Sequence, residues 1–160
     1  MEKKFADAQV EVKVRDITSD IGIPTMAAVA DDVLLKDPML LTIGIGTHTS
    51  ARIAVMRALT EVAQSRLTQI HGAREDTTRA DLRKKMGYDR AKRINGYWFK
   101  ENGTVDYGNV KSSDTDDFKT DIENVIALLE KQGLDRVIIV DLTREEIGIP
   151  VVRVIVPGLE

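Results

Sequence analysis

The chain has 160 residues with 42% hydrophobic and 4% aromatic content, which predicts one aliphatic core and a single domain. Because cysteine is absent, disulfide bonds, thiolate metal sites and cysteine nucleophiles are excluded. The net charge of −3 disfavours generic nucleic-acid binding. The sequence has neither a signal-like N-terminal segment nor an apolar run of about 18 residues, so we expect a cytoplasmic protein.

The N-terminal part of the chain predicts short strands. Val10, Val12 and Val14 alternate with charged residues, which is the period of a strand with one buried face. Residues 26–30 and 40–43 are short apolar runs and predict two further strands before the first long helix.

A long helix is predicted over residues 50–71. At about 100° per residue, one arc about 80° wide carries the polar side chains of Ser50, Arg57, Glu61, Gln64, Thr68 and His71. The other side carries the apolar side chains of Met56, Leu59, Ala63, Leu67 and Ile70. This pattern fits either a solvated stripe on a surface helix or one wall of an internal site. Arg66 projects into the apolar side, so we expect a carboxylate, a phosphate or a subunit boundary opposite it.

The C-terminal part predicts one helix and two strands. Residues 117–131 repeat apolar side chains at helical spacing, with Ser113 or Thr115 as the N-cap and Gly133 as the stop. Residues 136–140 and 151–156 are apolar runs and predict buried strands.

The links between these apolar strands repeat a sequence. Residues 16–24 read DITSDIGIP and residues 141–150 read DLTREEIGIP, with six identities in nine aligned positions if one insertion is allowed. We infer two related strand–loop–strand units, at about 10–30 and 136–156, although common turn usage is the alternative. Packed by long helices at about 50–71 and 115–132, they predict an α+β fold with a mixed sheet system. Residues 96–107 predict a hairpin or an exposed excursion around an Asn102–Gly103 turn.

Several familiar sites are absent from the sequence. It contains no P-loop motif and no Gly-x-Ser-x-Gly motif. Gly44 and Gly46 precede the long helix, but Thr49 stands where a dinucleotide fingerprint needs its third glycine. His48 and His71 have no partner at zinc-ligand spacing.

The remaining polar residues suit phosphate and magnesium. The helix start near Ser50 offers backbone N–H groups, although such a terminus is usually capped by its own side chains. Glu61 with Gln64 one turn later suits partial ligation of Mg²⁺. Arg74 and Arg153 are candidates for gripping phosphate, with an exposed sheet face as the alternative for Arg153.

Six motifs, taken in order, resemble the C-terminal half of YcaO-family proteins. They are GIGTH at 44–48, RALTEVAQSRL at 57–67, GARED at 72–76, VDLT at 140–143, GIPVVRV at 148–154 and VPGLE at 156–160. The resemblance spans about residues 8–160, and residues 88–111 are its least characteristic part.

The resemblance implies an enzyme that uses ATP and Mg²⁺ to phosphorylate a backbone amide oxygen in a ribosomally made peptide or protein. The product is an azoline, a thioamide or an amidine, and the thioamide-forming, TfuA-associated branch is the nearest. By position, Glu61 and Gln64 match the family's Glu-x-x-Gln nucleotide and magnesium motif. Arg74 and Arg153 match arginines near the phosphates, and Arg66, Asp76 and His48 are weaker matches.

The family's N-terminal Ser-x-x-x-Glu-x-x-Glu-Arg region has no counterpart in residues 1–43. We therefore expect the C-terminal portion of a longer protein, inactive by itself. A TfuA-like or leader-binding partner and a homodimer are further expectations from the resemblance. A non-catalytic domain of the same fold, binding a peptide or a partner, is the alternative function.

Overall fold

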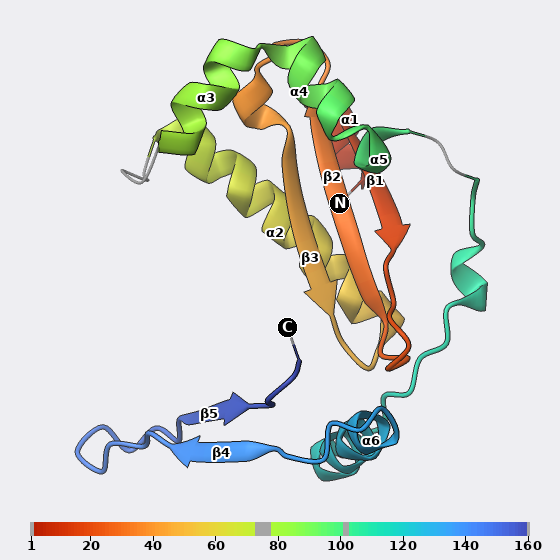
Figure 1. The fold of residues 1–160 in the computed structure, drawn as a ribbon, viewed down its shortest axis with the longest axis vertical. Coiled ribbons are helices and arrows are strands. Elements are labelled where there is room, and N and C mark those ends of the chain that lie inside the picture. Colours follow the sequence, from red (N-terminus) through yellow and green to blue (C-terminus); the bar gives the residue numbers. More distant parts are fainter. Residues whose placement is uncertain (1, 73–77, 101–102, 160) are drawn as a thin grey trace. The chain divides into compact units, whose positions relative to one another are not determined.

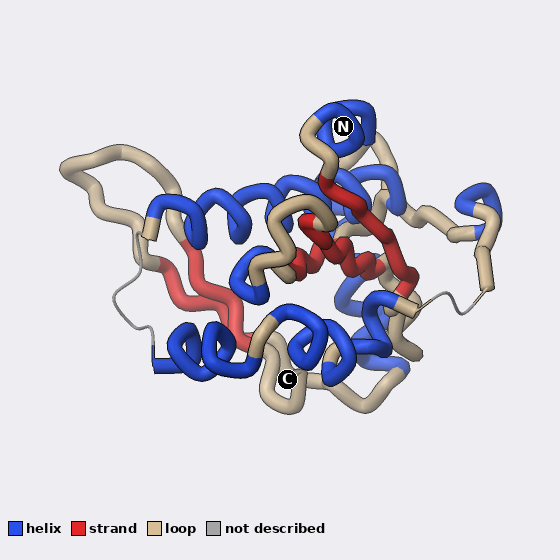
Figure 2. The backbone as a smooth tube through the Cα atoms, turned by 90° about the horizontal axis from the view of Figure 1, so that it is seen from above, coloured by secondary structure: helices blue, strands red, loops and turns tan. Residues whose placement is uncertain are grey.

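A computed structural model describes residues 2–72, 78–100 and 103–159 of the chain (Figure 1). They form two compact units, one within residues 1–18 and 23–113 and the other within residues 19–22 and 114–160. Both units combine helices with antiparallel strands, so the α+β class is confirmed; Figure 2 colours the helices blue and the strands red.

The first unit contains a three-stranded sheet in the order β1–β2–β3, with both pairings antiparallel. Its elements in chain order are α1 (Glu2–Asp7), β1 (Val10–Asp16), β2 (Thr25–Asp32), η1 (Pro38–Leu40), β3 (Thr42–Thr47), α2 (Ala51–His71), α3 (Thr78–Met86), α4 (Tyr88–Ile94), α5 (Gly96–Phe99) and η2 (Tyr107–Asn109). The first two strands and the long helix were predicted. The third strand begins at Thr42 rather than residue 40, because Asp37 caps a 3-10 turn by accepting a hydrogen bond from Met39 N–H at 2.8 Å.

Helix α2 lies directly against β3 because two glycines remove the side chains between them. A Cβ on Gly44 would lie 2.3 Å from Val62 N, and one on Gly46 would lie 2.2 Å from Ala54 O. Only glycine fits at such a distance. Gly44 and Gly46 therefore serve close packing of helix on strand, in agreement with the rejection of a dinucleotide fingerprint.

This close approach also decides which face of α2 is buried. The buried residues are small: Ala51, Ala54, Ala58 and Val62. Ala54, Ala58 and Val62 pack with Met26, Ala28 and Ala30 of β2 in the core. The predicted apolar side of the helix was wrong, since Leu67 and Ile70 are 55% and 58% exposed. A helix seated on glycines has room only for small side chains at the contact.

Residues 96–99 are helical and do not form a hairpin strand, whereas residues 103–109 are exposed, as the alternative of an exposed excursion expects. Gly96–Phe99 is α5, and residues 101–102 lie outside the described residues. Side chains of β1 bind the carbonyls at the end of α5: Lys13 Nζ donates to Phe99 O and Arg15 Nε to Trp98 O, both at 3.0 Å. Cations at the C-terminal end of a helix stabilise it.

The second unit contains α6 (Phe118–Lys131) and the two-stranded antiparallel sheet of β4 (Ile138–Asp141) and β5 (Val152–Ile155). The predicted N-caps of α6 were wrong. Asp117 caps the helix instead, accepting hydrogen bonds from Thr120 N–H at 2.8 Å and Thr120 Oγ1 at 2.7 Å. The stop at Gly133 is confirmed by its φ of +77°. Both strands are exposed along their length within this unit, in contrast to the buried strands that were predicted.

The two hairpins repeat the same hydrogen bonds, so their links share a local conformation, as either two related units or common turn usage would produce. Thr18 N–H donates to Asp16 Oδ1 at 2.9 Å, and Thr18 Oγ1 accepts from Thr25 N–H at 3.1 Å. In the second hairpin Thr143 N–H donates to Asp141 Oδ1 at 2.8 Å, and its Oγ1 accepts from Val151 N–H at 3.1 Å. The described strands pair only antiparallel and form two sheets, where one mixed sheet system was predicted.

Candidate functional site

The carboxylate of Glu61 is fixed at the open edge of the sheet. Its Oε2 accepts a hydrogen bond from the Ile45 backbone N–H at 3.1 Å. Ile45 stands opposite Ala27 in the register with β2, and this bond shows that its N–H points away from β2. One carboxylate oxygen of Glu61 is thus held by the fold. The side chain is exposed, so the other oxygen is available to a ligand.

Gln64 lies one turn further along the exposed side of α2. It is about 60° around the helix axis from Glu61, so both side chains leave the same half of the helix. The Gln64 amide has no hydrogen-bond partner among the described residues. The structure therefore brings together a carboxylate oxygen and a neutral amide on a rigid helix.

The N-terminus of α2 is capped from within the protein. Ser50 N–H donates to His48 Nδ1 at 2.9 Å, and Ala51 N–H donates to Ser112 Oγ at 3.0 Å. These contacts occupy N–H groups that a bound phosphate would otherwise use. The N-cap residue Ser50 forms no side-chain cap hydrogen bond, so the predicted capping by the terminus's own side chain is replaced by capping from Ser112 and from His48 in the turn that precedes α2.

Arg66 forms an ion pair with a buried carboxylate, which is one of the three partners expected opposite it. Its Nη2 lies 2.5 Å from Oδ2 of Asp32, whose side chain is 4% exposed. Burial alone would raise the pKa of Asp32, but hydrogen bonds from Leu35 N–H and from Arg66, together with the Arg66 charge, hold it below 3.8. Arg66 lies about 140° around the helix from Glu61, on the side that faces the sheet. It locks α2 onto the end of β2.

The remaining predicted site residues lie elsewhere. Arg153 is in β5 opposite Val140, exposed within the second unit, and forms no ion pair among the described residues. Arg74 and Asp76 lie outside the described residues. Their roles stay predictions.

A second buried charge cluster was missed by sequence reasoning. Asp31 accepts hydrogen bonds from Tyr88 Oη at 2.7 Å and from Lys92 Nζ at 2.6 Å. Burial and then the bond to Asp31 raise the pKa of Tyr88, and the bond to Asp31 raises the pKa of Lys92. The only sequence signal is an Asp-Asp pair ending an apolar strand. Because successive side chains point to opposite faces, Asp31 and Asp32 anchor α4 and α2 on the two sides of the sheet.

The side chains at this site would hold Mg²⁺ only together with phosphate oxygens and waters, because they are too few to complete its coordination shell. The described residues contain no group of three or more His, Asp or Glu side chains that could hold a metal ion. Glu61 offers one free oxygen and Gln64 one amide oxygen. Mg²⁺ is commonly held by one or two carboxylates, with substrate phosphates and waters completing its shell.

Among the described residues, no helix is long and apolar enough to cross a membrane.

A family model described as YcaO cyclodehydratase, ATP- and Mg²⁺-binding, matches residues 1–160. An uncharacterized protein of Methanothermobacter thermautotrophicus is 54% identical over 159 residues, covering 99% of this chain and 41% of its own length. An uncharacterized protein in the tfuA 3′ region of Rhizobium leguminosarum bv. trifolii is 28% identical over 165 residues, covering 100% of this chain and 39% of its own length. The chain thus spans about two fifths of these curated relatives.

Two solved structures share the fold. YcaO from Methanopyrus kandleri, bound with AMPPCP and Mg²⁺, has a TM-score of 0.80 at 29% identity, over 98% of this chain and 41% of that protein. A heterocyclase in complex with substrate and cofactor has a TM-score of 0.80 at 24% identity, over 99% of this chain and 21% of that protein.

Proposed function

The chain belongs to the YcaO family, and from this premise we propose that it supplies one wall of the nucleotide site of an ATP- and Mg²⁺-dependent enzyme. The proposed reaction activates a backbone amide of a ribosomally made peptide or protein by O-phosphorylation. The single observation that carries the proposal is the fixed carboxylate of Glu61 with Gln64 beside it on α2.

In the proposed chemistry, this wall of the nucleotide site positions the nucleotide and its cation. When bound, ATP with Mg²⁺ supplies the phosphoryl group that turns the amide oxygen into a phosphate leaving group. Glu61 would hold the cation through its free oxygen, because its other oxygen is bound to Ile45 N–H. Gln64 would bind beside it without adding charge. We assign Arg74, Arg153 and Asp76 to the nucleotide site by position in the sequence only, whereas Arg66, which is paired with Asp32, holds α2 on the sheet.

The partner and the product are proposed from the name of a relative. The name of the Rhizobium relative supports a TfuA-like partner and, with it, the thioamide-forming branch. Azoline and amidine formation are the competing outcomes. We also propose that the 160-residue chain by itself does not turn over substrate.

The test is Glu61→Gln in the protein at its full natural length, with Glu130→Gln, an exposed helical glutamate, as the matched control. Candidate peptides are incubated with ATP, Mg²⁺ and sulfide, and their masses are measured. Exchange of oxygen for sulfur indicates a thioamide, and loss of water indicates an azoline. We expect Glu61→Gln to abolish ATP-dependent modification and the control to retain it. Full activity of Glu61→Gln would support a non-catalytic binding domain instead.

A further inference from the structure

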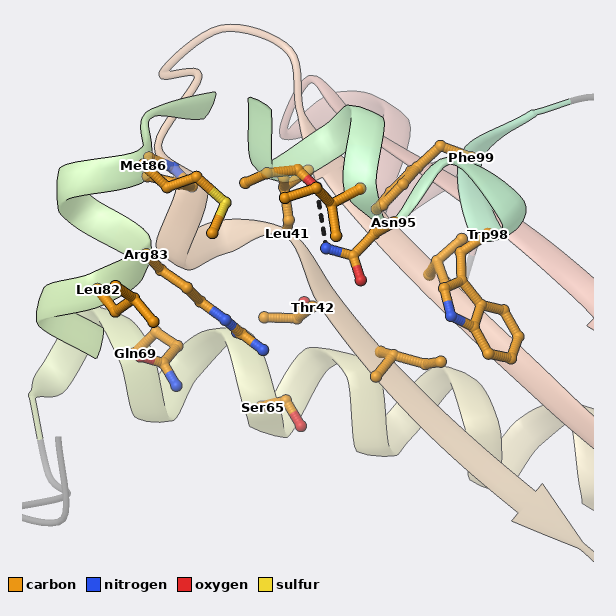
Figure 3. Close-up of a pocket in the computed structure, with 15 residues that line it drawn as sticks. Leu41, Thr42, Ser65, Gln69, Leu82, Arg83, Met86, Asn95, Trp98 and Phe99 are labelled. Carbon is orange, nitrogen blue, oxygen red and sulfur yellow. Dashed lines mark hydrogen bonds between the residues drawn. The ribbon is translucent and has the colours of Figure 1, made fainter. Parts of the chain in front are cut away.

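The first unit contains a cavity of about 480 Å³ bounded by β3, the C-terminal half of α2 and the helices α3 to α5 (Figure 3). Its walls are largely apolar: Ile43 comes from β3, Met86 from α3, Ile94 from α4, and Trp98 and Phe99 from α5. An apolar pocket of this size with a few polar groups is typical of a binding site. Among the residues that the structure describes, none of the site residues predicted from the sequence lines it.

One positive charge extends into this apolar cavity. Figure 3 shows the Arg83 side chain leaving α3 toward Thr42 and Ser65. Arg83 forms no ion pair among the described residues, unlike Arg66 and Lys92. A guanidinium beside apolar walls complements a ligand that joins an apolar group to a carboxylate.

The cavity adjoins the open edge of the sheet that carries Glu61. Ile43 lines the cavity, and Ile45, two residues along the same strand, donates its N–H to Glu61. Two strand residues span about 7 Å. Since β3 is an outer strand in the described sheet, the backbone groups of Ile43 and the C=O of Ile45 face outward and can pair with an extended peptide, whereas the Ile45 N–H is already bonded to Glu61. A peptide anchored in the cavity would therefore pass close to Glu61.

We propose that the cavity binds an apolar side chain of an extended peptide, next to an acidic residue whose carboxylate pairs with Arg83. The proposal rests on the proposed function insofar as this peptide is the substrate. It adds a sequence preference to that substrate: an apolar residue beside a glutamate or aspartate.

Trp98 is the only tryptophan of the chain and lines the cavity, so its fluorescence reports occupancy directly. The probes are acetyl-Gly-Leu-Glu-Gly-amide and the same peptide with Gln in place of Glu, titrated into the 160-residue chain without ATP or Mg²⁺. We expect a saturable change with the Glu peptide and affinity for the Gln peptide lower by about tenfold or more. Arg83→Met should bind both peptides alike, whereas Arg93→Met, an exposed arginine outside the cavity, should keep the preference.

Equal affinities for the two peptides in the unmodified chain would overturn the proposal without reference to any variant. So would unchanged Trp98 fluorescence. Hexanoate binding as tightly as the Glu peptide would assign the cavity to small organic acids instead. Because titration needs no nucleotide, its failure is distinct from failure of the proposed function. Glu61→Gln should lose modification activity and still bind the Glu peptide.

Discussion

Glu61 on α2 is bonded through Oε2 to the backbone N–H of Ile45 on β3, at 3.1 Å. This bond ties the carboxylate to the same strand against which α2 is seated through Gly44 and Gly46. The two glycines determine how closely α2 approaches β3. This distance determines which backbone groups of β3 the Glu61 carboxylate can reach. A side chain held by its own scaffold is pre-organised for a ligand on its free side.

Gly44→Ala and Gly46→Ala should each destabilise the chain by about 1–3 kcal/mol or more, because the added Cβ would collide with the backbone of α2. Urea denaturation followed by circular dichroism measures the loss. Gly96→Ala is the control, since its Cβ would meet only the Lys100 side chain at 3.5 Å, an ordinary contact. Wild-type stability of Gly44→Ala would show that the helix is not seated as described.

Arg66→Met should cost about 3–5 kcal/mol, because it leaves the buried Asp32 carboxylate without its partner. Asp32→Asn should cost less, because the Arg66 side chain that it leaves unpaired is only partly buried. The double variant should cost less than the sum of the two, since it removes both charges together. Thermal denaturation of the unmodified chain, the two single variants and the double variant measures the interaction free energy of the two side chains. Additive losses would show that the two side chains do not interact in solution.

Stability should fall on acidification because of the same pair. The pKa of Asp32 in the folded chain lies below its usual value, so the carboxylate contributes its full stabilisation only at pH values well above that usual value. That stabilisation is lost as pH falls through the folded pKa. Denaturant midpoints measured between pH 3 and pH 6 should therefore decline at the acid end less steeply in Asp32→Asn than in the unmodified chain. Parallel curves would contradict this assignment.

The long helices and the first two strands were predictable because their periodicity is local. Arg66 could be assigned an opposite charge for the same reason, but not Asp32 as its partner, 34 residues away. The cluster around Asp31 joins residues 57 positions apart and leaves no periodic signal. The buried face of α2 was misjudged because hydrophobicity favours its large side chains, whereas the glycines of β3 admit only small ones.

The repeated hydrogen bonds of the two hairpins can be tested separately. Thr18→Val and Thr143→Val each remove the hydroxyl that accepts a backbone N–H, from Thr25 and Val151 respectively. Each should cost about 0.5–1.5 kcal/mol. Amide hydrogen exchange should accelerate at Thr25 in the first variant and at Val151 in the second. Unchanged exchange at both amides would mean that the shared Asp-x-Thr pattern does not hold these loops.

The 160-residue chain should bind ATP–Mg²⁺ only weakly, with a dissociation constant of about 1 mM or weaker. The described residues provide few ligands for Mg²⁺. Glu61 offers one free oxygen, and no acidic cluster among the described residues would hold the cation. Arg66 is already neutralised by Asp32, and the α2 terminus is capped by Ser112 and His48. Isothermal titration calorimetry measures the affinity, and Gln64→Ala should weaken what remains. Low-micromolar binding would show that this chain holds enough of the site to act without further residues.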